Sequence, residues 1–253
     1  MWIYGAFLYG TLLLCGVVTF FTLRRYDLRP LEPWRAVLAA TAIGAVLMWA
    51  SRAGQDATVE MLLSPERMEL TNLAYAMIAA VLEEAAKLLT VFCVALIFRR
   101  DFQEHSDGIY YGALAGLGAA ILESVHVLGW PSGLEFLPSQ EPIRLAGHLV
   151  MGSITCAALG FFAAGERRWM WAVPVSYLLG CILHTLWDWV AHEAADSYRS
   201  EGVLRWHHTA ASIFLMLLGL FSFKLLVRAA SRLQERHFAP TCSAPDHADT
   251  IRS

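Results

Sequence analysis

The sequence predicts an all-α fold, a polytopic membrane bundle of about seven transmembrane helices. Composition is the first observation: the 253 residues are 57% hydrophobic and 16% charged, whereas a soluble domain carries about a quarter charged residues. The second is that the hydrophobic residues form long, nearly charge-free runs, most of them long enough to cross a hydrocarbon core of about 30 Å. Runs of this length favour helices, because a transmembrane strand needs only about ten residues with strict alternation.

The predicted helices follow these runs in order. They cover residues 2–23, 36–51, 72–98, 109–130, 145–164, 171–191 and 208–227. We expect a single transmembrane domain over 1–235 and a disordered cytoplasmic tail over 236–253, where Pro240 and Pro245 lie in a polar segment. No basic stretch precedes the first run, so we expect a retained helix there and no cleaved signal peptide.

The distribution of Lys and Arg predicts the orientation. If the N-terminus is outside, most of these residues lie in inner segments. The outer loops then hold Arg52, Arg67, Arg144, Arg199 and Arg205. Because cytoplasmic loops carry an excess of Lys and Arg, we expect the N-terminus outside and the C-terminus in the cytoplasm. No basic block suggests a nucleic acid, so the expected surroundings are the lipid bilayer of a cell membrane.

Ionisable residues inside the third run are the first candidates for a functional site. Such residues cost at least about 2.5–3.5 kcal/mol each near the middle of a membrane helix, so they indicate function by default. Glu83, Glu84 and Lys87 lie about eleven residues into the run. Glu83 and Lys87 are four apart and can pair, leaving Glu84 to face a reaction centre, or the roles are reversed. A structural ion pair within the bundle is the alternative.

The fourth run combines a row of glycines with a second acidic residue. Gly108, Gly112 and Gly116 recur every four residues, which predicts close contact with a neighbouring helix. Glu123 and His126 follow three residues apart on one face. The glycine row would therefore bring Glu123 close to a neighbour.

Two histidines complete the set of buried candidates. His148 lies near the start of the fifth run, where a structural role is the alternative. His184 and Asp188 are four apart on the sixth, and a carboxylate beside an imidazole fixes its tautomer and raises its basicity. In the expected orientation all these residues can meet at one depth in the outer half of the bilayer.

These motifs together resemble the PrsW family of intramembrane proteases, of glutamic or metallo type, which is distantly related to the CAAX-processing and bacteriocin-processing membrane proteases. The resemblance covers about residues 70–190. Its motifs are Glu83-Glu84-Ala85-Ala86-Lys87, the glycine-rich segment from Asp107 to Glu123, His148 with Gly152, and His184 with Asp188. The sequence departs from the family pattern at Ser124 and His126. The resemblance implies cleavage of a single-pass membrane protein, such as an anti-sigma factor, near the outer face of a bacterial inner membrane.

Two versions of peptide hydrolysis fit these residues. In the first, Glu83 or Glu84 is the general base, His148 orients the water, and His184, held by Asp188, stabilises the oxyanion. Lys87 would hold the acidic pair. In the second, His148 and His184 bind zinc with Glu123 or Asp188, and a glutamate is the base. A thiol mechanism through Cys181 is disfavoured.

Two further classes of protein remain open at this point. A proton-coupled or metal-ion transporter would also place Glu, His and Asp inside the membrane. It would usually show internal repeats and broken helices, which we do not find in the sequence. A non-catalytic membrane scaffold could retain the same fold, and its function would tolerate Glu84→Gln.

Overall fold

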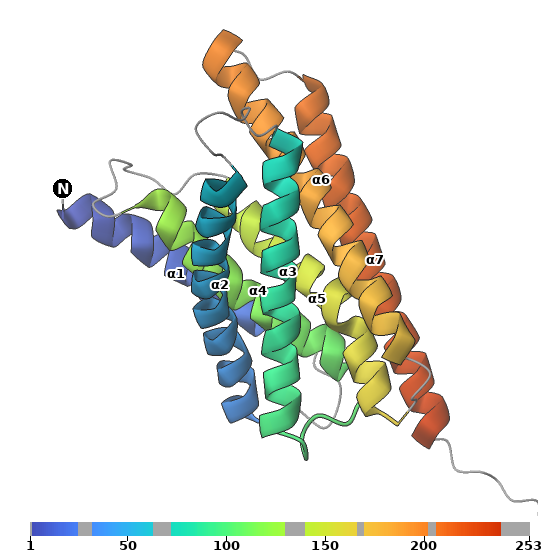
Figure 1. The fold of residues 1–253 in the computed structure, drawn as a ribbon. Coiled ribbons are helices and arrows are strands. Elements are labelled where there is room, and N and C mark those ends of the chain that lie inside the picture. Colours follow the sequence, from blue (N-terminus) through green and yellow to red (C-terminus); the bar gives the residue numbers. More distant parts are fainter. Residues whose placement is uncertain are drawn as a thin grey trace, which may run out of the picture.

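A computed structural model describes residues 2–24, 32–62, 72–129, 140–165, 170–201 and 206–238. Within these ranges it has seven α-helices and no strand, which confirms the predicted fold class (Figure 1). The helices are α1 (Trp2–Arg24), α2 (Trp34–Leu62), α3 (Asn72–Ile97), α4 (Asp107–Leu128), α5 (Gln140–Ala163), α6 (Ala172–Glu201) and α7 (Trp206–Phe238). Every predicted run corresponds to one of them.

Several helices extend beyond the hydrophobic runs that predicted them. α2 continues to Leu62 instead of ending near 51, α5 begins at Gln140 instead of 145, and α6 reaches Glu201 instead of 191. The runs mark only the strongly apolar part of each helix, whereas backbone hydrogen bonding continues through polar residues as well. Arg52, Arg144 and Arg199, which we expected in outer loops, therefore lie within α2, α5 and α6. The predicted domain end at 235 falls within α7, and the tail beyond Phe238 lies outside the described residues.

α4 lies at the centre of the bundle, and its glycines confirm the predicted close helix contact. All its residues from Asp107 to Ala120 are buried. A Cβ atom on Gly112 would lie 2.3 Å from the carbonyl oxygen of Gly152 on α5, and one on Gly116 would lie 2.1 Å from that of His148. Real Cβ atoms do not approach that closely, so only glycine lets the backbones of α4 and α5 touch.

The opposite face of α4 packs closely against α2. A Cβ on Gly118 would lie 2.0 Å from the carbonyl oxygen of Thr41, and one on Gly44 would lie 2.5 Å from that of Ala115. α4 is thus held between two helices through its small residues. This arrangement fixes the depth at which α2, α4 and α5 present their polar side chains.

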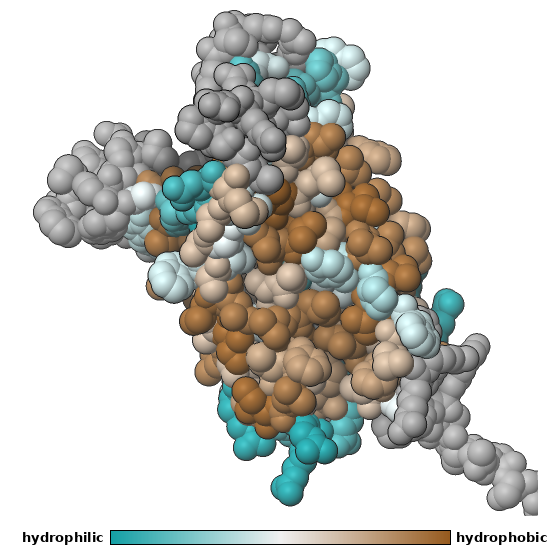
Figure 2. Space-filling view, viewed as in Figure 1, coloured by the Kyte–Doolittle hydropathy of each residue, from teal (hydrophilic) through white to brown (hydrophobic). Residues whose placement is uncertain are grey.

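The surface has the composition of a protein that faces lipid. Figure 2 shows hydrophobic residues over the middle of one face and hydrophilic residues at its lower end. Four of the described helices are long and apolar enough to cross a membrane: Trp34–Met61, Asp107–Leu128, Glu141–Ala163 and Trp206–Glu235. α3 is of similar length but carries three charged residues at its middle. With large apolar side chains exposed over most helices, the chain is a multi-pass membrane protein.

Candidate metal and catalytic site

Glu84 on α3 is surrounded by partners from three helices. Its Oε1 lies 2.5 Å from Lys87 Nζ, one turn along the same helix, and 2.7 Å from His184 Nδ1 on α6. The hydroxyl of Thr155 on α5 donates to its Oε2 at 2.6 Å. The side chains of Glu84 and Lys87 are both fully buried. Of the two pairings that the sequence allowed, Lys87 therefore takes Glu84, and Glu83 is left for other contacts.

Glu83 keeps one carboxylate oxygen open. Its Oε1 accepts a hydrogen bond from Gln55 Nε2 on α2 at 3.0 Å. Its Oε2 is buried, makes no hydrogen bond to any described residue, and lies 3.5 Å from His184 Nε2. Adjacent residues on a helix point about 100° apart, so Glu83 faces α2 and the centre of the bundle, while Glu84 faces α5 and α6. Glu83 is the α3 carboxylate that is free to react or to bind a ligand.

His184 on α6 joins the two α3 carboxylates to Asp188. Its Nδ1 lies on Glu84, as described above, and its Nε2 is 3.3 Å from Asp188 Oδ2. The predicted pair on one face of α6 is present, although Asp188 shares His184 with α3. Cys181, one turn earlier, lies with its Sγ 3.9 Å from the carbonyl oxygen of Ala80, so the thiol points to the α3 backbone. This placement gives no support to a thiol mechanism.

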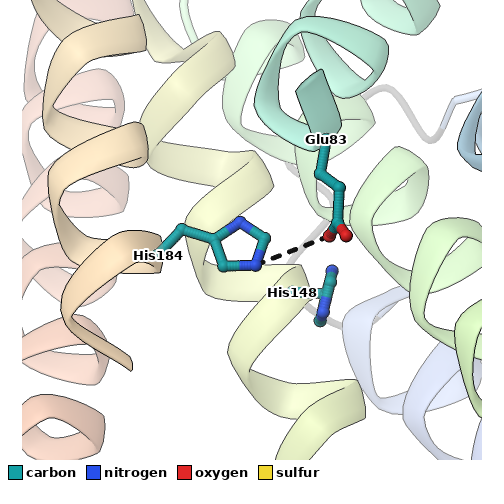
Figure 3. A group of neighbouring side chains, drawn as sticks. All are labelled: Glu83, His148 and His184. Atoms are coloured by element: carbon teal, nitrogen blue, oxygen red, sulfur yellow. Dashed lines mark ion pairs between the residues drawn. The ribbon is translucent and has the colours of Figure 1, made fainter. Parts of the chain in front are cut away.

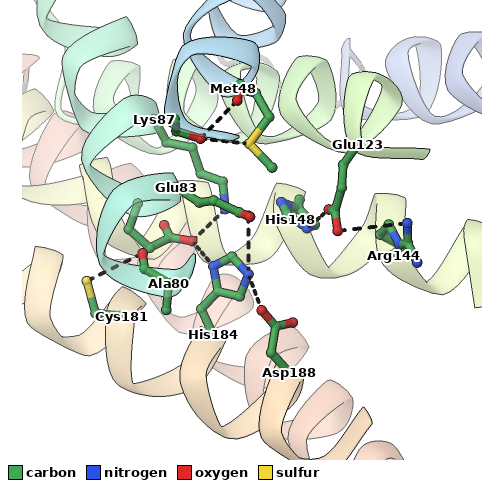
Figure 4. A network of polar contacts seen from close by, with 12 residues as sticks. Met48, Ala80, Glu83, Lys87, Glu123, Arg144, His148, Cys181, His184 and Asp188 are labelled. Carbon is green, nitrogen blue, oxygen red and sulfur yellow. Dashed lines mark hydrogen bonds and ion pairs between the residues drawn. The ribbon is translucent and has the colours of Figure 1, made fainter. Parts of the chain in front are cut away.

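His148 on α5 brings Glu123 to the same place. Figure 4 shows the two side chains facing each other, with His148 Nε2 2.8 Å from Glu123 Oε2. Arg144, one turn before His148, lies 3.8 Å from Glu123 and 3.5 Å from Glu141. The ring centroids of His148 and His184 are 5.1 Å apart. The structure therefore joins the predicted candidates into one polar cluster, which consists of Glu83, Glu84, Lys87, Glu123, His148, His184 and Asp188.

Three members of the polar cluster could hold a metal ion. Glu83, His148 and His184 each offer one ligand atom, these atoms lie within 4.8 Å of one another, and all three side chains are buried (Figure 3). His148 Nδ1 is buried without a hydrogen-bond partner among the described residues, as is the open oxygen of Glu83. Three protein ligands with a fourth position left open is the arrangement of catalytic zinc sites.

The carboxylates around this trio support the same interpretation. Metal-binding histidines usually direct their second ring nitrogen to a carboxylate, which fixes the tautomer and the ring orientation. His184 directs Nδ1 to Glu84, and His148 directs Nε2 to Glu123. One nitrogen of each imidazole thus lies on a carboxylate. The other nitrogen of His148 has no hydrogen-bond partner among the described residues, and that of His184 faces Glu83 and Asp188. The donor set fits zinc, and Glu83 is the carboxylate that could complete it, where the sequence suggested Glu123 or Asp188.

Residues 32–133 match the family described as PrsW family intramembrane metalloprotease. This segment of the chain is therefore similar to the PrsW family. A curated relative named Protease PrsW, from Geobacillus kaustophilus (strain HTA426), is 34% identical over 116 residues, which are 44% of this chain and 49% of the relative. Another of that name, from Bacillus subtilis (strain 168), is 30% identical over 112 residues, 43% of this chain and 50% of the relative. The chain spans about half the length of these relatives, and no solved structure matches it significantly.

The PrsW match and the geometry are complementary. The match begins at 32 and ends at 133, so it includes Glu83, Glu84 and Glu123 but neither of the two histidines. His148 and His184 are placed at the PrsW carboxylates by the packing of α5 and α6 alone. The match also includes α2, which lies outside the resemblance over residues 70–190.

Sequence reasoning missed three residues that contact the polar cluster. Gln55 was missed because α2 was expected to end near 51; its signal is the spacing Met48, Ser51, Gln55, which are all buried on one face. Thr155 stands seven residues after His148, two turns along one face of α5. Arg144 was assigned to a loop. The spacing of Gln55 and Thr155 could have indicated both.

His126, at the position where the sequence departs from the PrsW pattern, is exposed and lies outside the polar cluster. It is three residues beyond Glu123, yet Glu123 turns toward His148 while His126 faces outward. The structure therefore does not place His126 among the metal-ligand candidates.

Proposed function

We propose that this chain is an intramembrane metalloprotease that cuts a single-pass membrane protein near the outer face of a bacterial inner membrane. The observation that carries the proposal is the buried group of Glu83, His148 and His184, in which one carboxylate oxygen and one imidazole nitrogen lack hydrogen-bond partners among the described residues. The PrsW match over 32–133 supports it. An anti-sigma factor is the kind of substrate that the family resemblance suggests.

The proposed orientation has the N-terminus outside and the C-terminus in the cytoplasm. It is supported by the concentration of Lys and Arg in the segments that would then be cytoplasmic. With this orientation, α6 runs outward, and Asp188 lies on the outer side of His184.

Zinc is the proposed metal, held by Glu83, His148 and His184. When bound, it would supply Lewis acidity to a water molecule and to the carbonyl group of the scissile peptide. Glu84 and Glu123 orient the two imidazoles, and Lys87 balances the charge of Glu84. Asp188 transfers the proton from the water to the leaving amine, because its side chain is 26% exposed and can reach a substrate.

A metal-free reaction would assign the residues differently. Glu83 would then be the general base, since its Oε2 has no hydrogen-bond partner among the described residues. Glu84 does not suit that role in either version, because Lys87, His184 and Thr155 occupy its oxygens. Zinc content separates the two versions.

The polar cluster lies on unbroken helices. α3, α4, α5 and α6 each continue as regular helix through their ionisable residues, whereas transporters usually build ion sites from interrupted helices. We therefore give the protease precedence over a proton-coupled or metal-ion transporter and over a non-catalytic scaffold.

The test is cleavage of a single-pass membrane substrate by the purified protein in liposomes, with zinc measured on the same samples. We compare wild type with Glu83→Gln and His184→Ala, using Glu60→Gln, an exposed carboxylate on α2, as the matched control. We expect wild type and control to cleave and to contain one zinc, and the two site variants to lose both properties while remaining folded. A folded wild type that cleaves no member of a broad substrate panel would refute the proposal, and ion flux lost in the site variants would favour the transporter.

A further inference from the structure

A crevice between α2 and α4 leads from the membrane-facing surface to the polar cluster. It has a volume of about 200 Å³. Its lining includes Met48, Trp49 and Arg52 from α2 and Leu122, Glu123 and His126 from α4. Glu123 is the member of the polar cluster that lines it, so whatever enters the crevice arrives next to His148.

The crevice exists because two halves of the α2–α4 contact differ in side-chain size. Near Gly44 and Gly118 the two backbones touch, since a Cβ on either glycine would overlap the backbone of the opposite helix. One turn further along α2, the larger side chains of Met48 and Trp49 follow Gly44 and line the crevice. The glycine contact thus acts as the closed end, and the crevice opens beyond it.

Both walls of the crevice are connected to the candidate metal ligands. On the α4 wall, Glu123 lies 2.8 Å from His148. On the α2 wall, Arg52 Nη1 lies 3.5 Å from Gln55 Oε1, and Gln55 Nε2 donates to Glu83 at 3.0 Å. A group bound at Arg52 is therefore two contacts away from Glu83.

The mouth of the crevice is open to lipid. Trp49 is 70% exposed and Val125, which also lines the crevice, is 41% exposed. A larger groove of about 600 Å³ lies between α1, α5 and α7, but no residue of the polar cluster lines it. Only the α2–α4 crevice, among these two, joins the membrane to the site.

The charges in the crevice favour an anionic group. Glu123 is compensated by His148 and Arg144. Arg52 has no ion pair among the described residues, and its Nε is buried without a hydrogen-bond partner. A buried guanidinium donor that lacks a partner is costly unless a ligand supplies one. The exposed imidazole of His126 stands at the same opening.

We propose that the α2–α4 crevice is the lateral entrance for the substrate's membrane segment, and that Arg52 binds an acidic side chain close to the cleaved peptide bond. This inference rests on the proposed protease function. It assigns the substrate a chemical feature, a carboxylate near the cleavage position. It also assigns Arg52 the role of a specificity residue that does not take part in the chemistry.

The entrance is tested by photo-cross-linking in liposomes. A benzoylphenylalanine replaces Trp49, whose exposure lets the fold accept it, in a Glu83→Gln background that leaves the substrate uncut. The matched control carries the same probe at Leu220, which is 43% exposed and lines the larger groove. We expect cross-links to a single-pass substrate from Trp49 and none from Leu220. Cross-links from Leu220 and none from Trp49 would refute the proposal that the α2–α4 crevice is the entrance.

The role of Arg52 is tested with three substrates that differ only in an Asp, Asn or Lys near the cleavage position. The Asp carboxylate would form a charge-assisted hydrogen bond with the buried guanidinium donor of Arg52, which Asn cannot form. We therefore expect the Asp substrate to raise cross-linking and cleavage roughly tenfold or more over the Asn substrate. Arg52→Glu should move the preference to Lys, and Arg228→Glu, in the larger groove, should change nothing. Equal yields from all three substrates would overturn the assignment. Specific cross-linking without cleavage by wild type would support the proposed entrance and refute the protease function.

Discussion

The pairing of Glu84 with Lys87 allows a quantitative test of the site. Both side chains are fully buried and their charged atoms are 2.5 Å apart. Removing one partner of such a pair leaves the other charge buried and uncompensated, which typically costs about 3–5 kcal/mol. Glu84→Gln keeps the shape of the side chain and an acceptor oxygen for Thr155 but removes the charge. We expect it to lower the free energy of unfolding by about 3–5 kcal/mol.

Lys87→Met should cost less than Glu84→Gln. It removes the ammonium, but the carboxylate of Glu84 keeps two partners, the Thr155 hydroxyl at 2.6 Å and His184 at 2.7 Å. Lys87 has no such second carboxylate within contact distance among the described residues. Thus the two single variants should be unequal, with Glu84→Gln the more destabilising.

The double variant measures the interaction itself. With both charges gone, neither remains uncompensated, so Glu84→Gln/Lys87→Met should cost less than the sum of the single changes by about 1–3 kcal/mol. The assay is reversible unfolding in mixed micelles followed by tryptophan fluorescence. All variants are compared in protein stripped of metal, where Glu83→Gln is the control on the same helix, because its amide oxygen can still accept from Gln55. We expect it to cost under about 1 kcal/mol. Single changes that are equally mild and strictly additive would refute the buried ion pair.

Three further outcomes follow from the geometry. Glu83→Gln should remove both cleavage and zinc, whereas Asp188→Asn should lower cleavage about a hundredfold and leave the zinc content unchanged. Single-turnover assays and metal analysis measure the two properties. Loss of zinc in Asp188→Asn would instead make Asp188 a zinc ligand. A zinc chelator should abolish cleavage by wild type, and added zinc should restore it; full activity in the chelator would favour the metal-free reaction. Gly116→Ala should prevent stable folding, because its Cβ would lie 2.1 Å from the carbonyl oxygen of His148. Gly10→Ala meets no atom of the described residues within 4 Å and should leave the thermal stability in detergent unchanged.

The fold was predictable because the membrane imposes it. A chain with hydrophobic runs of this length must satisfy its backbone amides within each run, and a helix does so without neighbours. Helix ends were less predictable, since a polar residue such as Gln55 continues a helix as easily as it ends one. That uncertainty concealed Gln55 and Arg144, which contact Glu83 and Glu123.

The assignment of the α3 carboxylates could not be made from the sequence. Lys87 is three residues from Glu84 and four from Glu83, and both spacings allow a contact on a helix. The choice depends on where α6 places His184, since Nδ1 of that ring lies 2.7 Å from Glu84. Contacts between helices that are a hundred residues apart leave no trace in local spacing.

The glycines and the ionisable residues of this site depend on each other. Gly116 touches the backbone at His148, and Gly152, four residues further along α5, touches Gly112. On α6, a Cβ on Gly180 would lie 1.9 Å from the hydroxyl of Thr155, which donates to Glu84. Small residues therefore bring three backbones together at the depth where the charged side chains lie. A buried charge in a membrane needs a partner from another helix, and that partner can reach it only if the backbones approach closely. This requirement explains why the motifs combine glycine with glutamate and histidine, and why replacing either kind of residue should remove the site.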